Sequence, residues 1–171
     1  MATRIFSTLI LFFGMASCTG QPKEENNSAA MPGGIQWMGF EEAVRKSESD
    51  KKKVFIDVYT DWCGWCKRMD ATTFKNDTVT DFMNQYYHAV KLNAESRDTI
   101  RFRDQVFVFR PEYKANEIAL SLLNGKMGYP SFVVLDENFS MLNVIAGYQT
   151  PEQLLPVLQY FAGNKHLNKT E

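Results

Sequence analysis

Short apolar runs alternate with segments of helical periodicity along most of the chain. Apolar residues recur at helical spacing over 40–49 and 77–85, and each of these segments is followed by a β-rich run, at 54–59 and 87–92. Runs that are apolar almost throughout are typical of strands covered on both faces of a sheet. The pattern therefore predicts an α/β fold in which helices flank a central sheet.

The alternation continues through the second half of the chain. Thr150 is expected to cap the last helix, and Gly125 is expected to end the helix before it in a left-handed conformation. β-forming residues on either side of Arg103-Asp104-Gln105 favour a hairpin there. The elements predicted in this half are a hairpin over 100–109, a helix over 112–123, strands over 131–135 and 142–145, and a helix from Pro151.

Composition and charge narrow the classes of function. A length of 171 residues with 44% hydrophobic content suits one globular domain with short extensions. The formal net charge of −1 argues against a nucleic-acid binder, because such proteins carry a basic excess. Three cysteines are too few for a disulfide-stapled miniprotein. We divide the chain into a signal peptide over 1–17, a tether over 18–34, a domain over 35–162 and a polar tail over 163–171.

The N-terminal segment has the layout of a secretory signal. Arg4 precedes an apolar run over 5–13, which is too short to span a bilayer, since a spanning helix takes about 20 residues. Met15-Ala16-Ser17-Cys18 resembles a bacterial lipobox, which implies that Cys18 is lipidated as the first residue of the mature protein. Met15 stands where leucine is usual, so ordinary signal-peptidase cleavage, with Cys18 removed or unused, stays open.

The segment after Cys18 is polar and is expected to form a flexible tether, because it has too little apolar surface to order itself. Lys23-Glu24-Glu25 resembles the surface-export signals of some Bacteroidetes lipoproteins. We therefore expect an extracytoplasmic protein, anchored to a membrane by a lipid. The sequence leaves open whether it faces the periplasm or the cell surface.

Candidate chemistry is concentrated in Trp62-Cys63-Gly64-Trp65-Cys66-Lys67, which follows the first predicted strand and opens a helix expected over 63–72. The unpaired N–H groups and the dipole of a helix N-terminus stabilise a thiolate. Cys63 is therefore the candidate nucleophile in thiol–disulfide exchange. Cys66 lies one turn further along the same face and is placed to resolve the mixed disulfide.

The region from Trp37 to Phe161 resembles a thioredoxin-fold protein. The motif Asp-Trp-Cys-x-x-Cys-Lys resembles the corresponding motif in the C-terminal domain of the disulfide reductase DsbD and in secreted bacterial thioredoxin-like proteins. The resemblance implies a central mixed β-sheet flanked by helices, with a β-hairpin insertion around 96–111 that we expect to shape partner choice. It rests on Val54 to Lys67, Lys91-Leu92-Asn93, Gly128-Tyr129-Pro130-Ser131 and Gly147.

The resemblance also implies roles for single residues. Cys63 matches the exposed attacking cysteine and Cys66 the buried resolving cysteine of a redox disulfide. Asp57 matches the buried acid behind the pair, where desolvation should raise its pKa and allow it to relay a proton. Lys91 matches the partner of this acid. A purely structural Asp57–Lys91 pair remains the alternative.

Substrate binding is assigned in the same way to residues around the cysteines. Pro130 matches a cis-proline that leaves the backbone of Tyr129 free to pair with an extended substrate, although a trans-proline that starts a strand is the alternative. Trp62, Gly64 and Trp65 complete the expected substrate-binding set. Trp65 replaces the proline of thioredoxin itself, so the reduction potential cannot be carried over by resemblance.

These assignments predict a thiol–disulfide oxidoreductase that reduces disulfides of extracytoplasmic proteins and needs no dissociable cofactor. The expected partners are protein thiols and disulfides and an upstream electron donor such as a membrane reductase, and the protein is expected to be a monomer. A disulfide oxidase or isomerase is the first alternative, and a thioredoxin-fold binding module with little turnover is the second.

A metal site is not expected. A structural zinc site needs four ligands, and this chain adds only His88 and His166 to one Cys-x-x-Cys pair. We interpret His88 as a packing residue at the start of a strand.

Overall fold

The computed structural model describes residues 33–164. The predicted signal peptide, the lipidation of Cys18, His166 and nearly all of the tether and the tail lie outside the described residues.

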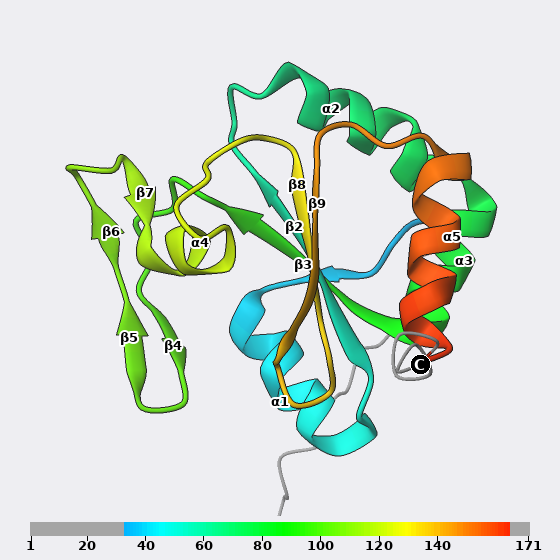
Figure 1. Cartoon of the computed structure of the whole chain (residues 1–171), viewed down its shortest axis with the longest axis horizontal. Coiled ribbons are helices and arrows are strands. Elements are labelled where there is room, and N and C mark those ends of the chain that lie inside the picture. The colour runs from blue at the N-terminus through cyan, green and yellow to red at the C-terminus, as the bar shows by residue number, and fades with distance from the viewer. Residues whose placement is uncertain (1–32, 165–171) are drawn as a thin grey trace, which may run out of the picture. The chain divides into compact units, whose positions relative to one another are not determined.

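A mixed sheet of five strands forms the centre of the described domain (Figure 1), as predicted. Strand β3 runs parallel to both β1 and β2, whereas β8 is antiparallel to β2 and β9 is antiparallel to β8. The strands in spatial order are β1 (Trp37–Met38), β3 (Tyr87–Asn93), β2 (Lys53–Tyr59), β8 (Ser131–Leu135) and β9 (Met141–Ala146).

Helices cover both faces of this sheet, with α3 and α5 on one side and α1 and α4 on the other (Figure 1). Alternate residues of β2 point to opposite sides, so Phe55 packs in the core on the α3 and α5 side and Ile56 in the core on the α1 and α4 side. This explains why β2 is an almost continuous apolar run. The helices are α1 (Phe40–Asp50), α2 (Gly64–Ala71), α3 (Asp77–Tyr86), α4 (Glu117–Leu122), α5 (Pro151–Ala162) and the short 3₁₀-helix η1 (Thr73–Lys75).

The directions of the strands bring four connections to one edge of the sheet. The parallel strands β2 and β3 both end there, and the antiparallel strand β8 begins there. Strand β9, which is antiparallel to β8, ends at the same edge. The start of α2, the β3–β4 connection, the segment before β8 and the segment after β9 are therefore neighbours.

The insertion between β3 and α4 contains two hairpins. The first joins β4 (Ile100–Phe102) to β5 (Gln105–Phe107), as predicted, and the Phe102 ring packs edge-on against Phe40 of α1 at 5.5 Å. The second joins β6 (Phe109–Arg110) to β7 (Ala115–Asn116) and was not predicted.

Helix α4 begins at Glu117, so the predicted start at 112 was wrong. Lys114 has φ of +50°, which is incompatible with a helix, and it lies in the turn of the second hairpin. The Asn116 side chain then accepts a hydrogen bond from the N–H of Ile118 at 3.2 Å and caps the helix.

The other predicted ends are close to those observed. Gly125 has φ of +71° after α4, in the left-handed region. The N–H of Thr150 donates to the Gln153 side chain at 2.9 Å at the start of α5. Leu154, Leu158 and Phe161 of this helix are buried.

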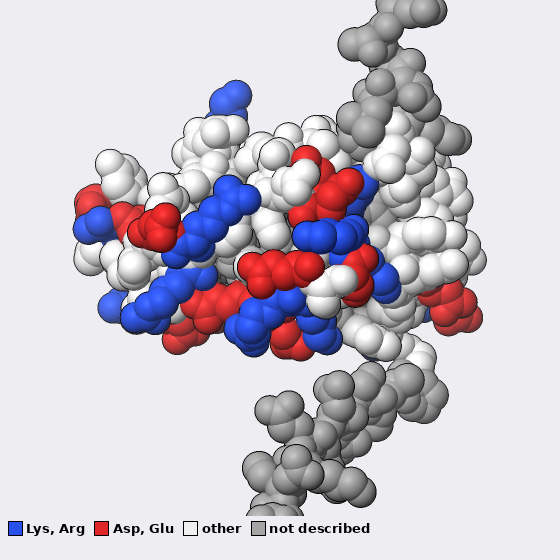
Figure 2. Space-filling view, turned by 90° about the horizontal axis from the view of Figure 1, so that it is seen from below, with Lys and Arg blue, Asp and Glu red and all other residues white. Residues whose placement is uncertain are grey.

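Within residues 33–164, no helix has the length and apolar character that crossing a membrane requires. Acidic and basic side chains are interspersed on the face seen in Figure 2, without a patch of one sign. This distribution agrees with the near-zero net charge of the sequence.

Candidate active site

Cys63 and Cys66 form a disulfide at the start of α2, with their Cα atoms 5.3 Å apart. Cys63 is the N-cap of the helix, and its Sγ accepts a hydrogen bond from the N–H of Cys66 at 3.1 Å. The sulfur therefore lies where the unpaired N–H groups of a helix N-terminus stabilise negative charge. This local structure matches the nucleophile position predicted from the sequence.

The expectation that Cys63 is exposed was wrong for this oxidised state. Only 4% of Cys63 is accessible, compared with 2% of Cys66. The reason is that the Cys63 sulfur is bonded to Cys66 and also caps the helix, so it is turned towards the protein. The two cysteines are thus nearly equally buried while the disulfide is closed.

Asp57 and Lys91 are brought together behind the disulfide by the register of the sheet. They are paired positions on the parallel strands β2 and β3, and Lys91 Nζ donates to Asp57 Oδ2 at 2.6 Å. Asp57 is 1% exposed, and its other oxygen, Oδ1, has no hydrogen-bond partner within residues 33–164. One oxygen is therefore neutralised by a cation while the other is desolvated and unpaired.

Burial raises the pKa of Asp57 to about 6, against the opposing effect of the Lys91 charge and hydrogen bond. This confirms the expected direction and its cause. Burial lowers the pKa of Lys91, but the charges and hydrogen bonds of Asp57 and Asp70 together outweigh it and raise that pKa. Lys91 therefore stays protonated, and Asp57 is the group of the pair that titrates near neutral pH.

Aromatic rings surround the Lys91 ammonium, and part of the Lys91 side chain is exposed to solvent. Its Nζ is 5.0 Å from the ring centres of both Trp37 and Tyr59, within the range of cation–π attraction. A recess of about 450 Å³ between α1 and the β3–β4 connection is lined by Lys91, Tyr59 and Asp98, among others. The recess thus reaches Lys91 of the pair, whereas Asp57 is buried behind it.

Asp70 is a further member of this group that the sequence reasoning missed. Its Oδ1 accepts a hydrogen bond from Lys91 Nζ at 2.5 Å, and its negative charge contributes to the raised pKa of Asp57. The available signal was spacing, because Asp70 follows Cys66 by four residues and so lies on the same face of α2.

Exposed aromatic residues flank the disulfide and form a rim, with Trp62 on one side and Trp65 on the other. The Trp62 side chain is 66% exposed, and its ring meets Tyr129 edge-on at 5.8 Å. The indole Nε1 donates to Glu95 Oε1 at 3.0 Å. Glu95 comes from the β3–β4 connection and was not singled out from the sequence, because nothing distinguishes one glutamate in a polar segment.

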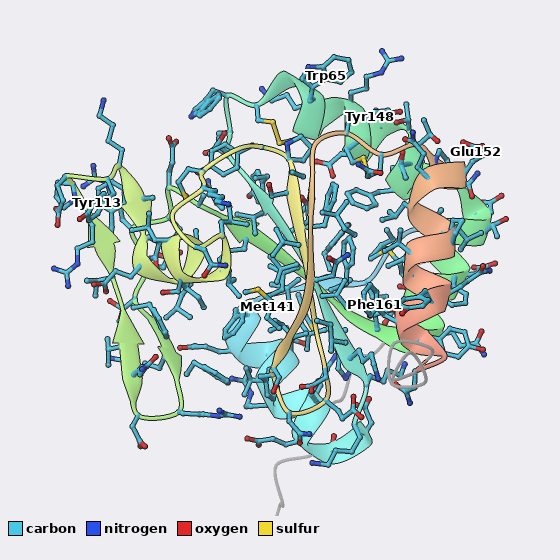
Figure 3. All side chains as sticks on the ribbon, viewed as in Figure 1. Trp65, Tyr113, Met141, Tyr148, Glu152 and Phe161 are labelled. Carbon is cyan, nitrogen blue, oxygen red and sulfur yellow. A yellow bond between two sulfur atoms is a disulfide. The ribbon has the colours of Figure 1, made fainter. Side chains whose placement is uncertain are left out.

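Trp65 forms the other side of the rim. It is 59% exposed, and its ring lies 5.5 Å from the ring of Tyr148, which follows β9. The Arg68 guanidinium lies 6.0 Å from the centres of both rings. Figure 3 shows Trp65 and Tyr148 together at the end of the sheet where α2 begins. Tyr148 and Arg68 were not predicted as site residues.

The segment before β8 has the conformation expected for a substrate-pairing strand. The Tyr129–Pro130 peptide bond is cis, as the resemblance implied. Within residues 33–164, the backbone N–H and C=O of Tyr129 form no hydrogen bond, whereas the C=O of Pro130 accepts one from Gly147 at 2.8 Å. Tyr129 thus offers an unpaired backbone next to Trp62, the residue that precedes Cys63.

The remaining sequence predictions are placed as follows. Gly64 is exposed at the first position of α2, and an added Cβ would meet no atom within 4 Å. His88 is buried near the start of β3, with Nε2 at 2.8 Å from Asp50 Oδ1, and lies away from the cysteines. The described part of the chain contains no cluster of His, Cys, Asp and Glu that suits a metal ion.

Comparison with known families and proteins points to one fold. The family model of the thioredoxin-like domain matches residues 40–162. The chain is 24% identical over 106 residues to the thiol:disulfide interchange protein DsbD of Pseudoalteromonas atlantica, a match that covers 58% of this chain and 18% of DsbD. An uncharacterised protein of Caenorhabditis elegans is 28% identical over 67 residues, which are 39% of this chain and 9% of that protein. The chain thus spans only a small part of the length of these relatives.

Solved structures give the same result. A DsbH oxidoreductase has a TM-score of 0.54 and 19% identity, and the match covers 81% of this chain and 92% of that one. A candidate disulphide isomerase from Bacteroides thetaiotaomicron has a TM-score of 0.55 and 23% identity, with 83% and 99% covered. A thioredoxin from Thermus thermophilus has a TM-score of 0.57 and 14% identity, with 75% and 87% covered. At these identities the similarity shows a shared fold.

Proposed function

The chain belongs to the family of thioredoxin-like domains, and we propose that it works as a protein-disulfide reductase outside the cytoplasm. The observation that carries this proposal is the Cys63–Cys66 disulfide at the start of α2, beside the unpaired backbone of Tyr129. Such an arrangement presents a reactive sulfur next to a backbone on which an extended protein segment can pair. The function requires protein thiols or disulfides as partners.

The reaction begins from the reduced form. The Cys63 thiolate attacks one sulfur of a substrate disulfide, a new S–S bond forms to Cys63, and the second substrate sulfur leaves as a thiolate that takes up a proton. The Cys66 thiolate then attacks Cys63 Sγ, releases the first substrate sulfur and closes the Cys63–Cys66 disulfide. Two electrons have passed to the substrate. A dithiol protein must return two electrons by the same exchange in reverse.

Asp57 supplies proton transfer in this scheme. Cys66 must lose its proton before it attacks, and an acid with a pKa of about 6 is an effective acceptor near neutral pH. The Oδ1 of Asp57, which has no hydrogen-bond partner within residues 33–164, is the atom that takes up that proton in this scheme. Lys91 and Asp70 act as positioning residues that set the pKa of Asp57.

The direction of electron flow is part of the proposal and rests on the DsbD-like form of the motif. Insulin reduction with a dithiol donor tests it, because wild type should accelerate the reaction and Cys63→Ser should not. Indifference to that substitution would favour a binding module. Measurement of the Cys63–Cys66 potential against glutathione tests the direction, since a value of about −120 mV, as in strong oxidants, would point to an oxidase.

The location is proposed from the signal-like layout and the lipobox resemblance. We propose that Cys18 carries the lipid anchor, that a membrane reductase is the upstream donor and that the protein acts as a monomer. Labelling with radioactive palmitate in the producing cells should mark wild type and not Cys18→Ser. Equal labelling of both proteins would contradict the anchor while leaving the exchange chemistry untouched.

A further inference from the structure

The rim around the disulfide is acidic at one end and basic at the other. The order of strands at this edge of the sheet is β3, β2, β8 and β9, so Glu95, which follows β3, lies at one end and Tyr148, which follows β9, at the other. Arg68 lies over the ring of Tyr148. A protein segment that crosses Cys63 along this edge therefore meets a carboxylate on the β3 side and a guanidinium on the β9 side.

The carboxylate of Glu95 is held in place but is not neutralised. Its Oε1 accepts the Trp62 indole at 3.0 Å, and its backbone N–H donates to the Asn93 side chain at 2.9 Å. Among the ion pairs of residues 33–164, none includes Glu95. Arg97 is the basic residue that follows it in the sequence, but its guanidinium lies 4.6 Å from the ring centre of Phe109. Within residues 33–164, Oε2 of Glu95 has no ion-pair partner, so it can accept hydrogen bonds from a ligand.

Two aromatic rings accompany this carboxylate, the exposed ring of Trp62 and the partly buried ring of Tyr129. Trp62 and Tyr129 meet at an interplanar angle of 80°, and the Trp62 ring is mostly open to solvent. The Tyr129 ring and the Glu95 carboxylate both contact Trp62, and the charge of Glu95 adds to the rise that burial causes in the pKa of Tyr129. A carboxylate beside aromatic faces is the arrangement that attracts an ammonium or guanidinium group, through charge and through cation–π contact.

We propose that Glu95, Trp62 and Tyr129 form a subsite for a lysine or arginine side chain of the protein segment whose cysteine reacts with Cys63. The subsite deepens the exchange activity proposed above and rests on it. It defines a substrate class, namely protein disulfides that have a basic residue near the reactive cysteine. Glu95 acts here as a specificity residue through its second oxygen, while its first oxygen positions Trp62.

Matched peptide disulfides test this subsite. Each peptide carries one cysteine as a mixed disulfide with 2-mercaptoethanol and either Lys or Glu at one nearby position, on one side of the cysteine or the other. The second-order rate constant of the reduced protein is measured with each peptide at low and high salt. At the position that reaches the subsite, we expect the Lys peptide to react about tenfold faster than its Glu counterpart, and the ratio to shrink in high salt.

Substitutions assign the preference to Glu95. Glu95→Gln keeps an acceptor for the Trp62 indole but removes the charge, so the ratio should fall to about twofold or less, while Glu95→Lys should invert it. Asp61→Asn is the control, because Asp61 is an exposed carboxylate on the same flank that accepts from Asn93 at 3.1 Å, whereas the Trp62 indole donates to Glu95. This variant should keep most of the preference.

The outcomes separate this inference from the function on which it rests. Reaction with every peptide at one rate, or a ratio that Glu95→Gln leaves unchanged, would overturn the subsite and leave the exchange activity standing. A loss as large in Asp61→Asn as in Glu95→Gln would also overturn it, in favour of a general negative field. Failure of reduced wild type to react with any peptide would overturn the exchange activity and the subsite together.

Discussion

Asp57 and Lys91 are cross-strand neighbours, with the Lys91 ammonium 2.6 Å from the Asp57 carboxylate. Despite this contact, the pKa of Asp57 is raised to about 6, because burial outweighs the attraction of the cation. The pair is therefore an ion pair whose acid has a raised pKa. It keeps an acid with a perturbed pKa behind the disulfide, as groups poised for proton transfer require.

The raised pKa makes stability depend on pH in a defined direction. Because the folded pKa of about 6 lies above the ordinary 3.8, the folded protein binds the extra proton between these values. The stabilisation from Asp57 is complete below about pH 4 and is lost as the pH rises through 6, by about 3 kcal/mol at most. The free energy of unfolding of wild type minus that of Asp57→Asn should thus decrease between pH 4 and pH 7, as measured by denaturant unfolding with the disulfide closed.

Asp81→Asn is the control for that experiment, because Asp81 is an exposed carboxylate of α3. Its difference from wild type should stay nearly constant over the same pH range. A constant difference for Asp57→Asn as well would contradict the raised pKa.

Asp70 should influence the pKa of Asp57 through its charge, without a direct contact. Its charge helps to raise the pKa of Asp57, so Asp70→Asn should lower that pKa while leaving the Lys91–Asp57 contact in place. The carboxyl carbon resonance of Asp57, followed by NMR as a function of pH, measures the effect. Asp61→Asn removes a carboxylate from the same end of the sheet without touching Lys91, and an equal change in that variant would argue against a specific role for Asp70.

Asn116 ties the insertion to the sheet edge. It is fully buried, its Nδ2 donates to the carbonyls of Ser96 and Asp98, and its Oδ1 caps α4. Asn116→Ala removes the cap and leaves two carbonyls without their donor, so it should lower the free energy of unfolding by about 2 kcal/mol. Denaturant unfolding measures this loss.

The matched control for Asn116 is Asn138→Ala. Asn138 is exposed, and its contact with Arg103 uses only the backbone carbonyl. The free energy of unfolding should change by less than about 0.5 kcal/mol in this variant. A similar decrease in the free energy of unfolding in both variants would show that the contacts of Asn116 stabilise the fold no more than an exposed asparagine does.

Deletion of the hairpin is too disruptive to test whether the insertion selects protein partners, so a point substitution is preferable. Phe102 packs on Phe40 of the core, so deletion would remove a core contact. Tyr113 is 64% exposed on the second hairpin and lines a surface recess with Leu120 and Ser121 (Tyr113 is labelled in Figure 3). Tyr113→Ala should change the set of proteins trapped by a Cys66→Ser background.

The same Tyr113→Ala variant should reduce a small synthetic disulfide at the wild-type rate, because Tyr113 is distant in sequence and fold from the cysteines. Mass spectrometry of the trapped mixed disulfides provides the comparison. An unchanged set of trapped proteins would count against partner selection through this surface.

Some residues of the candidate site could be predicted from the sequence and others could not. The cysteines, Asp57, Lys91 and Pro130 occupy positions set by strand order and by motif spacing, so resemblance located them and the structure brings them to one edge. Glu95, Arg68 and Tyr148 could not be found in this way, because their roles depend on contacts between segments far apart in the chain. Asp70 lay within reach, since helical spacing from Cys66 already placed it on the inner face of α2.

The second hairpin shows a different limit. The residues at 112–116 were read as part of a helix, but the left-handed turn at Lys114 and the cap at Asn116 begin the helix later. An isolated lysine gives no local indication of a positive φ, because this conformation is stabilised by the pairing of β6 with β7. Tertiary contacts therefore decided where the helix starts.

The sulfur of Cys63 has two roles, since it accepts the N–H of Cys66 at the start of α2 and is also the atom that changes bonding partners. Each round of exchange must therefore alter the environment of one backbone amide. The Cys66 N–H becomes a built-in reporter of the redox cycle, whose chemical shift and hydrogen-exchange rate distinguish the dithiol, mixed-disulfide and disulfide states without an added label.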